Sequence, residues 1–225
     1  MATIAETLTV GRQRHQAGDL VRAEQIYRPI LQAAPANPEV WYLLGDVCYR
    51  LRKPAEAATC FRRVLELRPG NAQACNFLGA ALEAQGQLEE AAASYRQALC
   101  VQPDLPEAHN NLGDVLFKQG RADRAAACFQ QALRLQPDCA ETHYNLGLAL
   151  RALANPAGAI ACLRRAIQLK PGFAEAYNKL GPLLAEEGED DEALPFLREA
   201  VRLQPGLAGA HSNLGTALLE LGQQQ

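Results

Sequence analysis

The sequence predicts an all-α fold, an α-solenoid built from tandem helix-turn-helix units. Three observations predict it, and all three recur at a step of 34 residues along the 225-residue chain. A glycine preceded by a large apolar residue lies in the first half of each unit, a small alanine follows twelve residues later, and a proline lies near the end of the unit. A fixed period of this length is typical of stacked units whose apolar faces need a neighbour for burial. The phased positions are Gly11, Gly45, Gly79, Gly113, Gly147, Gly181 and Gly215; Ala23, Ala57, Ala91, Ala125, Ala159 and Ala193; and Pro35, Pro69, Pro103, Pro137, Pro171 and Pro205.

Each unit carries two apolar stripes at helical spacing. In the fourth unit Leu112 and Leu116 flank Gly113 in the first half, and Ala125 and Phe129 follow in the second half. Such stripes predict two antiparallel helices per unit. The glycine and the alanine are small because a larger side chain would push the crossing helices apart.

The boundaries of the units follow from their turn residues. Proline is predicted to end each second helix, because it lacks a backbone donor and clashes with the preceding turn. Glycine marks the turn between the two helices in Gly18-Asp19, Gln85-Gly86, Gln119-Gly120 and Glu187-Gly188. A single array over residues 1–225 is therefore predicted, with units at 4–37, 38–71, 72–105, 106–139, 140–173 and 174–207 and a half unit or capping helix at 208–225.

These phased residues resemble the tetratricopeptide-repeat (TPR) family, whose pattern reads Trp-x2-Leu-Gly-x2-Tyr, then Ala-x3-Phe, then Pro. The stretch Trp41-Tyr42-Leu43-Leu44-Gly45 is the closest match, and the resemblance covers essentially the whole chain. It implies a right-handed superhelix whose first helices line a concave groove. It also implies the function of a protein-interaction scaffold that binds an extended segment of a partner protein in that groove.

The groove positions that the resemblance implies define a candidate partner-binding site. Over the second to sixth units, eight carboxylates stand beside four basic side chains at these positions. This excess favours a partner segment that carries Lys or Arg and a few apolar anchors. For any single residue, the alternative is a merely solvated helix face. The candidate residues are Tyr42, Asp46, Tyr49, Asn76, Glu107, Asn110, Asn111, Asp114, Lys118, Asn145 and Asn178.

A second function stays open, the substrate-presenting arm of an O-linked N-acetylglucosamine transferase. The chain resembles the bacterial type of that repeat arm in segments such as His109-Asn110-Asn111-Leu112-Gly113. Asn111, Asn145 and Asn213 match the register of the asparagine ladder that holds substrate backbone there, whereas Lys179 departs from it. A carboxylate clamp for acidic tails is not expected, because the basic residues are scattered among acidic ones.

No catalytic constellation accompanies the repeats. The chain lacks a Gly-x4-Gly-Lys loop, a His-Glu-x2-His helix and a Gly-x-Ser-x-Gly elbow, and its only serines are Ser94 and Ser212. The seven cysteines have no Cys-x2-Cys spacing, which argues against a disulfide framework and a zinc module. Cys60, Cys128 and Cys162 share a second-helix register and are expected to be buried, reduced thiols. We expect no enzyme, no cofactor and no metal site.

Three histidines, His109, His143 and His211, occupy the register of Trp41. A ladder of metal ligands is the alternative to a structural role. Equivalent residues of stacked repeats lie about 10 Å apart, which is too far for one ion to bridge. We therefore predict that these rings replace the tryptophan in the core.

Charge and terminal composition give expectations about partners and location. The net charge of −3 disfavours nucleic acid, whose phosphates need a clustered basic surface. The start of the chain lacks the basic and apolar regions of a signal peptide, and no stretch is apolar enough for a membrane helix. We expect a cytoplasmic protein without a membrane partner.

Two places depart from the regular pattern. Pro182 and Pro195 fall inside predicted helices of the sixth unit, where we predict a local kink, because Pro182 removes a donor and clashes with the carbonyl of Asn178. Pro29 raises the same expectation in the first unit. The terminal half unit either caps the array or leaves an apolar edge for self-association through the terminal helix or for a domain of a longer chain.

Overall fold

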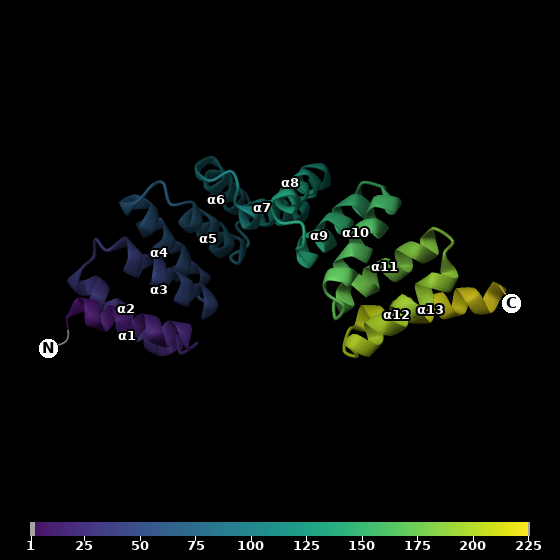
Figure 1. Cartoon of the computed structure of the whole chain (residues 1–225), viewed down its shortest axis with the longest axis horizontal. Helices are drawn as coiled ribbons and strands as arrows, with labels where there is room; N and C mark the ends of the chain where they lie inside the picture. The colour runs from purple at the N-terminus through teal and green to yellow at the C-terminus, as the bar shows by residue number, and fades with distance from the viewer. Residues whose placement is uncertain (1–2, 225) are drawn as a thin grey trace. The chain divides into compact units, whose positions relative to one another are not determined.

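The computed structural model describes residues 3–224, which contain thirteen α-helices and no strand (Figure 1). Each predicted unit holds one helix pair, so the predicted all-α class of tandem helical repeats is confirmed. The first helices of successive pairs begin at the same register, 34 residues apart. The helices are α1 (Ile4–Gln16), α2 (Leu20–Ala33), α3 (Pro38–Arg50), α4 (Pro54–Leu67), α5 (Ala72–Glu83), α6 (Leu88–Val101), α7 (Pro106–Lys118), α8 (Ala122–Leu135), α9 (Ala140–Ala152), α10 (Pro156–Leu169), α11 (Ala174–Glu186), α12 (Asp190–Leu203) and α13 (Ala208–Gln224).

The chain divides into two compact units, Met1–Val115 and Leu116–Gln225. In the compact unit Met1–Val115, each helix from α1 to α6 packs against the next. Residues of α5, α6 and the start of α7 share one buried cluster there. In the compact unit Leu116–Gln225, each helix from α8 to α13 packs against the next, and α13 also contacts α11. A single array with a right-handed superhelix stays a prediction.

Close helix crossing at the phased glycines is confirmed within both units. A Cβ atom added to the glycine would lie against the large residue sixteen positions later, which belongs to the second helix of the same pair. The nearest distances are 2.6 Å for Gly11 to Tyr27, 2.9 Å for Gly45 to Phe61, 2.6 Å for Gly79 to Tyr95, 3.0 Å for Gly147 to Leu163 and 2.5 Å for Gly181 to Leu197. At Gly215 no atom lies within 4 Å, because no second helix follows α13 among the described residues.

The closing prolines act through the residue before them. Each second helix ends two residues before its proline, and the intervening residue is not helical. Because proline crowds the backbone of its predecessor, that residue leaves the helical region. Its φ lies between −135° and −143° and its ψ between 70° and 93° at Ala34, Arg68, Gln102, Gln136, Lys170 and Gln204.

A left-handed residue forms the turn inside all six helix pairs. The four predicted turn glycines adopt φ values of 78° at Gly18, 76° at Gly86, 76° at Gly120 and 82° at Gly188. The second and fifth pairs have no glycine there. Instead Arg52 adopts φ 60° and Ala154 adopts φ 54°, which strains a residue that carries a Cβ.

Replacing Ala154 by glycine should therefore stabilise the protein. A left-handed conformation costs an L-residue about 1–2 kcal/mol, whereas glycine loses about 0.5–1 kcal/mol more backbone entropy on folding than alanine. We expect Ala154→Gly to raise the free energy of unfolding by up to about 1 kcal/mol, measured as the midpoint of urea denaturation. Ala152→Gly, two residues earlier in α9, is the matched control and should lower the midpoint. A lower midpoint for Ala154→Gly would contradict the strain at this turn.

The internal prolines do not interrupt their helices. Pro182 lies inside α11, Pro195 inside α12 and Pro29 inside α2, and each helix continues through its proline. A change of helix direction at these residues stays a prediction.

The rings at the Trp41 register have a structural role that differs from core packing. Trp41 Nε1 donates to the carbonyl of Pro35 at 2.8 Å, and the Nε2 atoms of His109, His143 and His211 lie 2.8–2.9 Å from the carbonyls of Pro103, Pro137 and Pro205. His109 and His143 are half-buried and His211 is exposed, so the prediction of core rings is wrong. A ring nitrogen that reaches a proline carbonyl fixes the loop between two repeats.

The cysteines divide by burial. Cys48, Cys60 and Cys75 are buried, which confirms the expectation for Cys60, whereas Cys128 and Cys162 are half-buried. Among residues 3–224, no helix combines the length and the apolar composition needed to cross a bilayer.

Candidate functional site

Tyr42 lies in an aromatic cluster that joins the second and third repeats. Its ring meets Phe61 edge-on at 5.7 Å and Phe77 edge-on at 5.8 Å, while Phe61 and Phe77 stack at 5.6 Å. Burial raises the pKa of the Tyr42 hydroxyl, and Asp46 adds to this effect. Tyr42 is thus held by packing, and only part of its ring is accessible to a partner.

Asp46 is engaged within the unit Met1–Val115. Its Oδ2 lies 2.7 Å from Nε2 of His15, which comes from α1, and 3.9 Å from Nη1 of Arg50. The His15 side chain is buried and its ring lies edge-on to Tyr27. Asp46 therefore links the first helices of two successive repeats.

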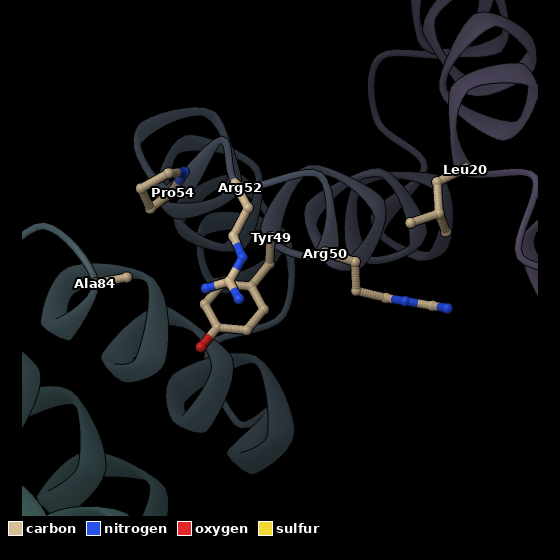
Figure 2. Close-up of a pocket in the computed structure, with 6 residues that line it drawn as sticks. All are labelled: Leu20, Tyr49, Arg50, Arg52, Pro54 and Ala84. Carbon is tan, nitrogen blue, oxygen red and sulfur yellow. The ribbon is translucent and has the colours of Figure 1, made fainter. Parts of the chain in front are cut away.

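Tyr49 lines a cavity of about 720 Å³ in the same unit, shown in Figure 2. The other lining residues are Leu20, Arg50, Arg52, Pro54 and Ala84. The cavity is thus lined by two arginines and one tyrosine. The apolar residues Leu20, Pro54 and Ala84, each at a helix end, complete its lining. Sequence reasoning missed Arg52. Its signal was present, because it occupies the turn position where four other repeats have glycine.

Two of the candidate asparagines are buried in amide pairs between repeats. Asn111 Nδ2 donates to Asn76 Oδ1 at 3.1 Å, and Asn213 Nδ2 donates to Asn178 Oδ1 at 2.9 Å. Asn76 is 6% exposed and Asn178 is 7% exposed, so both face the next repeat. Buried amides need such partners, because an unpaired polar group in the interior is costly. A partner-binding role for these residues stays a prediction.

The amide pair between Asn213 and Asn178 also compensates for a backbone hydrogen bond that Pro182 removes. Pro182 has no N–H group, so the carbonyl of Asn178 loses its bond within the helix. Asn213 Nδ2 from α13 lies 3.4 Å from this carbonyl oxygen as well as 2.9 Å from the side-chain oxygen. One amide thus approaches two acceptors on α11.

We expect Asn213→Ala to lower the free energy of unfolding by about 1–3 kcal/mol, because it leaves a buried amide oxygen without its donor. In a Pro182→Ala background the loss should be smaller by about 0.5–1 kcal/mol, since the restored N–H group returns a donor to the Asn178 carbonyl. The two single variants and the double variant are compared by urea denaturation. Strictly additive changes would show that Pro182 and Asn213 act independently.

The remaining candidates lie on first helices in both units. Glu107 is exposed in the first turn of α7, and Asn110 and Asp114 are partly exposed one and two turns later. Lys118, exposed, and Asn145, partly exposed, belong to the unit Leu116–Gln225. Their binding role stays a prediction.

Intramolecular ion pairs compensate several of the groove carboxylates. Arg12 binds Glu39, Lys170 Nζ lies 2.7 Å from Glu141, and Arg151 Nη2 lies 2.5 Å from Glu186. The hydrogen bond from Lys170 holds the pKa of Glu141 below its usual value. Arg12 and Lys170 are not among the four basic groove residues counted in the sequence, so they reduce the acidic excess, whereas Arg151 was already counted.

Tandem helix pairs crossing at a glycine, with inter-repeat loops fixed by ring nitrogens, define a tetratricopeptide-repeat protein. The family model of the cilia and flagella-associated protein 70 C-terminal domain, a TPR domain, matches residues 2–217. The chain belongs to this TPR family. Its fold is that of a protein-protein interaction scaffold.

Solved structures share the fold at low sequence identity. The APC/C hetero-tetramer Cut9-Hcn1 aligns with a TM-score of 0.82 and 21% identity, covering 96% of this chain and 43% of that chain. PilF of Pseudomonas aeruginosa aligns with a TM-score of 0.81 and 21% identity, covering 93% of this chain and 95% of that one. YrrB, described as a TPR protein with an unusual peptide-binding site, aligns with a TM-score of 0.68 and 20% identity, covering 83% of this chain and 96% of YrrB. No curated protein matches the chain significantly.

Proposed function

We propose that this TPR protein binds an extended segment of a partner protein along its first helices, and that the cavity beside Tyr49 receives one side chain of that segment. The cavity carries the proposal, because it combines a volume of about 720 Å³ with an aromatic ring and two guanidinium groups. TPR domains bind proteins, and YrrB provides a structural neighbour with a peptide-binding site. The other candidate residues predicted from the sequence, from Tyr42 to Asn178, are proposed as further contacts to the same partner segment.

The chemistry of the cavity favours an acidic side chain or a terminal carboxylate. Arg50 Nη1 lies 3.9 Å from Asp46 Oδ2, which is a long ion pair, and guanidinium groups bind carboxylates through paired hydrogen bonds. This preference differs from the basic segment that the acidic excess favours. The exposed Glu107 remains the natural partner of a basic residue elsewhere on the same segment.

A peptide-display selection on the purified chain tests the proposal. We expect enriched peptides with an acidic residue or C-terminal carboxylate beside an apolar anchor. Synthetic peptides should bind the Arg50→Gln, Arg52→Gly double variant about 10- to 100-fold more weakly than the wild type, as expected for lost bonds to a charged group. Arg52→Gly is suited to this test because glycine accepts the left-handed backbone.

Arg62→Gln, at an exposed arginine of α4 away from the cavity, is the matched control and should leave the affinity unchanged. Equal affinities of the double variant and the wild type would place the binding site elsewhere. Selection of purely basic peptides would instead favour the acidic face that the sequence indicates.

A further inference from the structure

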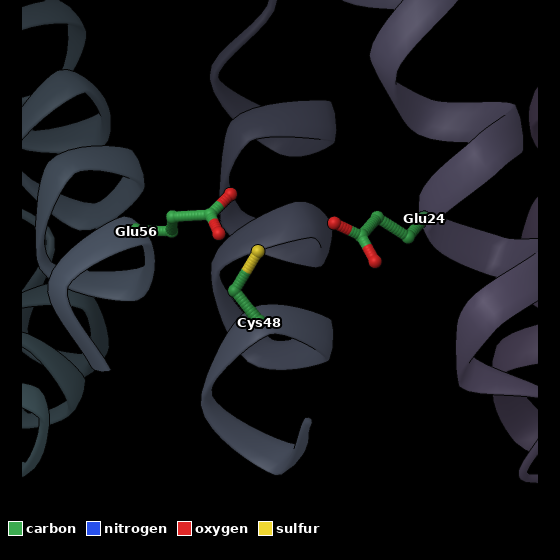
Figure 3. Close-up of side chains that lie close together, drawn as sticks. All are labelled: Glu24, Cys48 and Glu56. Carbon is green, nitrogen blue, oxygen red and sulfur yellow. The ribbon is translucent and has the colours of Figure 1, made fainter. Parts of the chain in front are cut away.

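A buried cluster of thiols and charges lies at the first interface between repeats. Glu24 of α2, Cys48 of α3 and Glu56 of α4 bring one ligand atom each to within 4.8 Å of one another. Figure 3 shows the two carboxylates reaching toward the Cys48 sulfur from opposite sides. Cys48 is fully buried, Glu24 is 8% exposed, and Glu56 opens the cluster to solvent.

Cys60 supplies a fourth donor to this cluster. Its thiol, on α4, is hydrogen-bonded with that of Cys48. Two thiols and two carboxylates make four donors, the number that zinc binds in a tetrahedral site.

The equivalent interfaces elsewhere in the chain show that the fold does not require this cluster. The positions of Glu24 and Cys48 are apolar at every later interface between complete repeats. A buried carboxylate costs free energy that an apolar pair does not, so its presence here points to a chemical use. The equivalent pairs are Ala58 and Leu82, Ala92 and Leu116, Ala126 and Leu150, and Ile160 and Leu184.

Two cations already balance the carboxylates. Lys53 Nζ lies 2.8 and 2.9 Å from the two oxygens of Glu24, and Arg28 Nη2 lies 2.6 Å from Glu24 Oε1 and also binds Glu56. The hydrogen bond from Lys53 holds the pKa of Glu24 below its usual value. With neutral thiols the cluster therefore has no net charge.

A divalent cation can bind without changing the net charge of the cluster. It would form two metal–sulfur bonds as the two S–H bonds break, and both protons would leave to solvent. The thiolates and the carboxylates together then offset the cation, Arg28 and Lys53. A carboxylate has about four lone-pair directions, so it can bind a metal and keep its hydrogen bond to a cation. Such outer hydrogen bonds orient metal-binding carboxylates.

We propose that Glu24, Cys48, Glu56 and Cys60 form a site for a divalent cation of the zinc class. Thiolates disfavour magnesium and calcium, and the two carboxylates disfavour monovalent copper. Metal–ligand distances of about 2.0–2.3 Å place neighbouring ligands about 3.3–3.8 Å apart. Metal binding therefore requires the ligand atoms of Glu24, Cys48 and Glu56 to draw together, and it requires Cys60, which lies outside this group, to move toward the carboxylates. The bound ion joins α2, α3 and α4. The sequence predicted no metal site because the donors are far apart along the chain.

Titration of the reduced, metal-free full chain with Co²⁺ tests the site by absorbance. We expect one equivalent to produce a thiolate-to-cobalt charge-transfer band, with release of two protons, and Zn²⁺ to remove the band by displacement. Cys48→Ala and Cys60→Ala should lose this band. Cys75→Ala, which removes an equally buried thiol from α5, is the matched control and should keep it.

Glu56→Gln keeps the test decisive if a buried variant fails to fold, because the Glu56 side chain is 47% exposed. Loss of this ligand should weaken Co²⁺ binding at least about 10-fold. The proposal is overturned if the wild type shows no thiolate band at millimolar Co²⁺, if Cys48→Ala gives the same band, or if Glu56→Gln binds with unchanged affinity. Any of these results would show that the cluster is an ion-pair network with a structural role.

Discussion

Gly79→Ala is expected to destabilise the protein by about 2 kcal/mol, although alanine is the better helix former. An added Cβ would lie 2.6, 2.7 and 2.9 Å from three ring atoms of Tyr95, which is completely buried. The ring cannot easily move aside, because its hydroxyl donates to Glu83 Oε2 at 2.9 Å. The added methyl group should therefore separate α5 from α6, and urea denaturation followed by circular dichroism measures the loss.

Gly215→Ala provides a control at the same position of another repeat. Gly215 lies inside α13 with no atom within 4 Å of an added Cβ, so only the helix preference changes. We expect this variant to gain up to about 1 kcal/mol. Opposite signs for the two variants would establish crossing, rather than helix propensity, as the reason for the phased glycine. A loss of similar size in both variants would contradict that explanation.

Alkaline pH is expected to unfold the protein through its buried tyrosines. Burial raises the pKa of Tyr95, with a further contribution from Glu83, and burial also raises the pKa of Tyr27. In the unfolded chain a tyrosine loses its proton near pH 10, whereas the folded protein retains it at that pH. The unfolded state then binds fewer protons, so stability is full below pH 10 and falls as the pH rises above it. Tyr95 alone should lower the free energy of unfolding by up to about 2 kcal/mol between pH 10 and pH 12.

The measurement is urea denaturation at a series of pH values from 8 to 12, for the wild type and Tyr95→Phe. The variant should be less stable at pH 8 by about 1 kcal/mol, because it lacks the hydrogen bond to Glu83. Its stability should fall less steeply above pH 10, since one titrating group is missing. Parallel curves for the two proteins would show that Tyr95 does not cause the alkaline loss.

Much of the fold could be predicted because the chain repeats its local pattern. The glycine at Gly79 and the alanine at Ala91 needed no tertiary information, since a fixed step predicts a repeated contact and a small residue predicts a close crossing. Gly86 was predictable as a turn in the same way, and its φ of 76° agrees. Arg52 and Ala154 adopt the same turn without glycine, so only the structure showed that they are strained.

The candidate site was less predictable, because first-helix residues of successive repeats interact with one another. A register identifies Asn76 and Asn178 as groove positions, but their burial depends on the amides of Asn111 and Asn213 in the next repeat. The histidines at the Trp41 register were misassigned to the core for a related reason. A ring that bonds a proline carbonyl has the same sequence pattern as a ring that packs.

The sequence by itself determined the repeat, the helix pairs and the positions where helices must approach closely, since each follows from a period and from side-chain size. The tertiary structure decided which polar groups meet across repeats. Glu24, Cys48 and Glu56 stand on three helices and share no local motif, yet their ligand atoms lie within 4.8 Å. Contacts of this kind depend on side-chain directions at helix crossings, which a linear pattern does not contain.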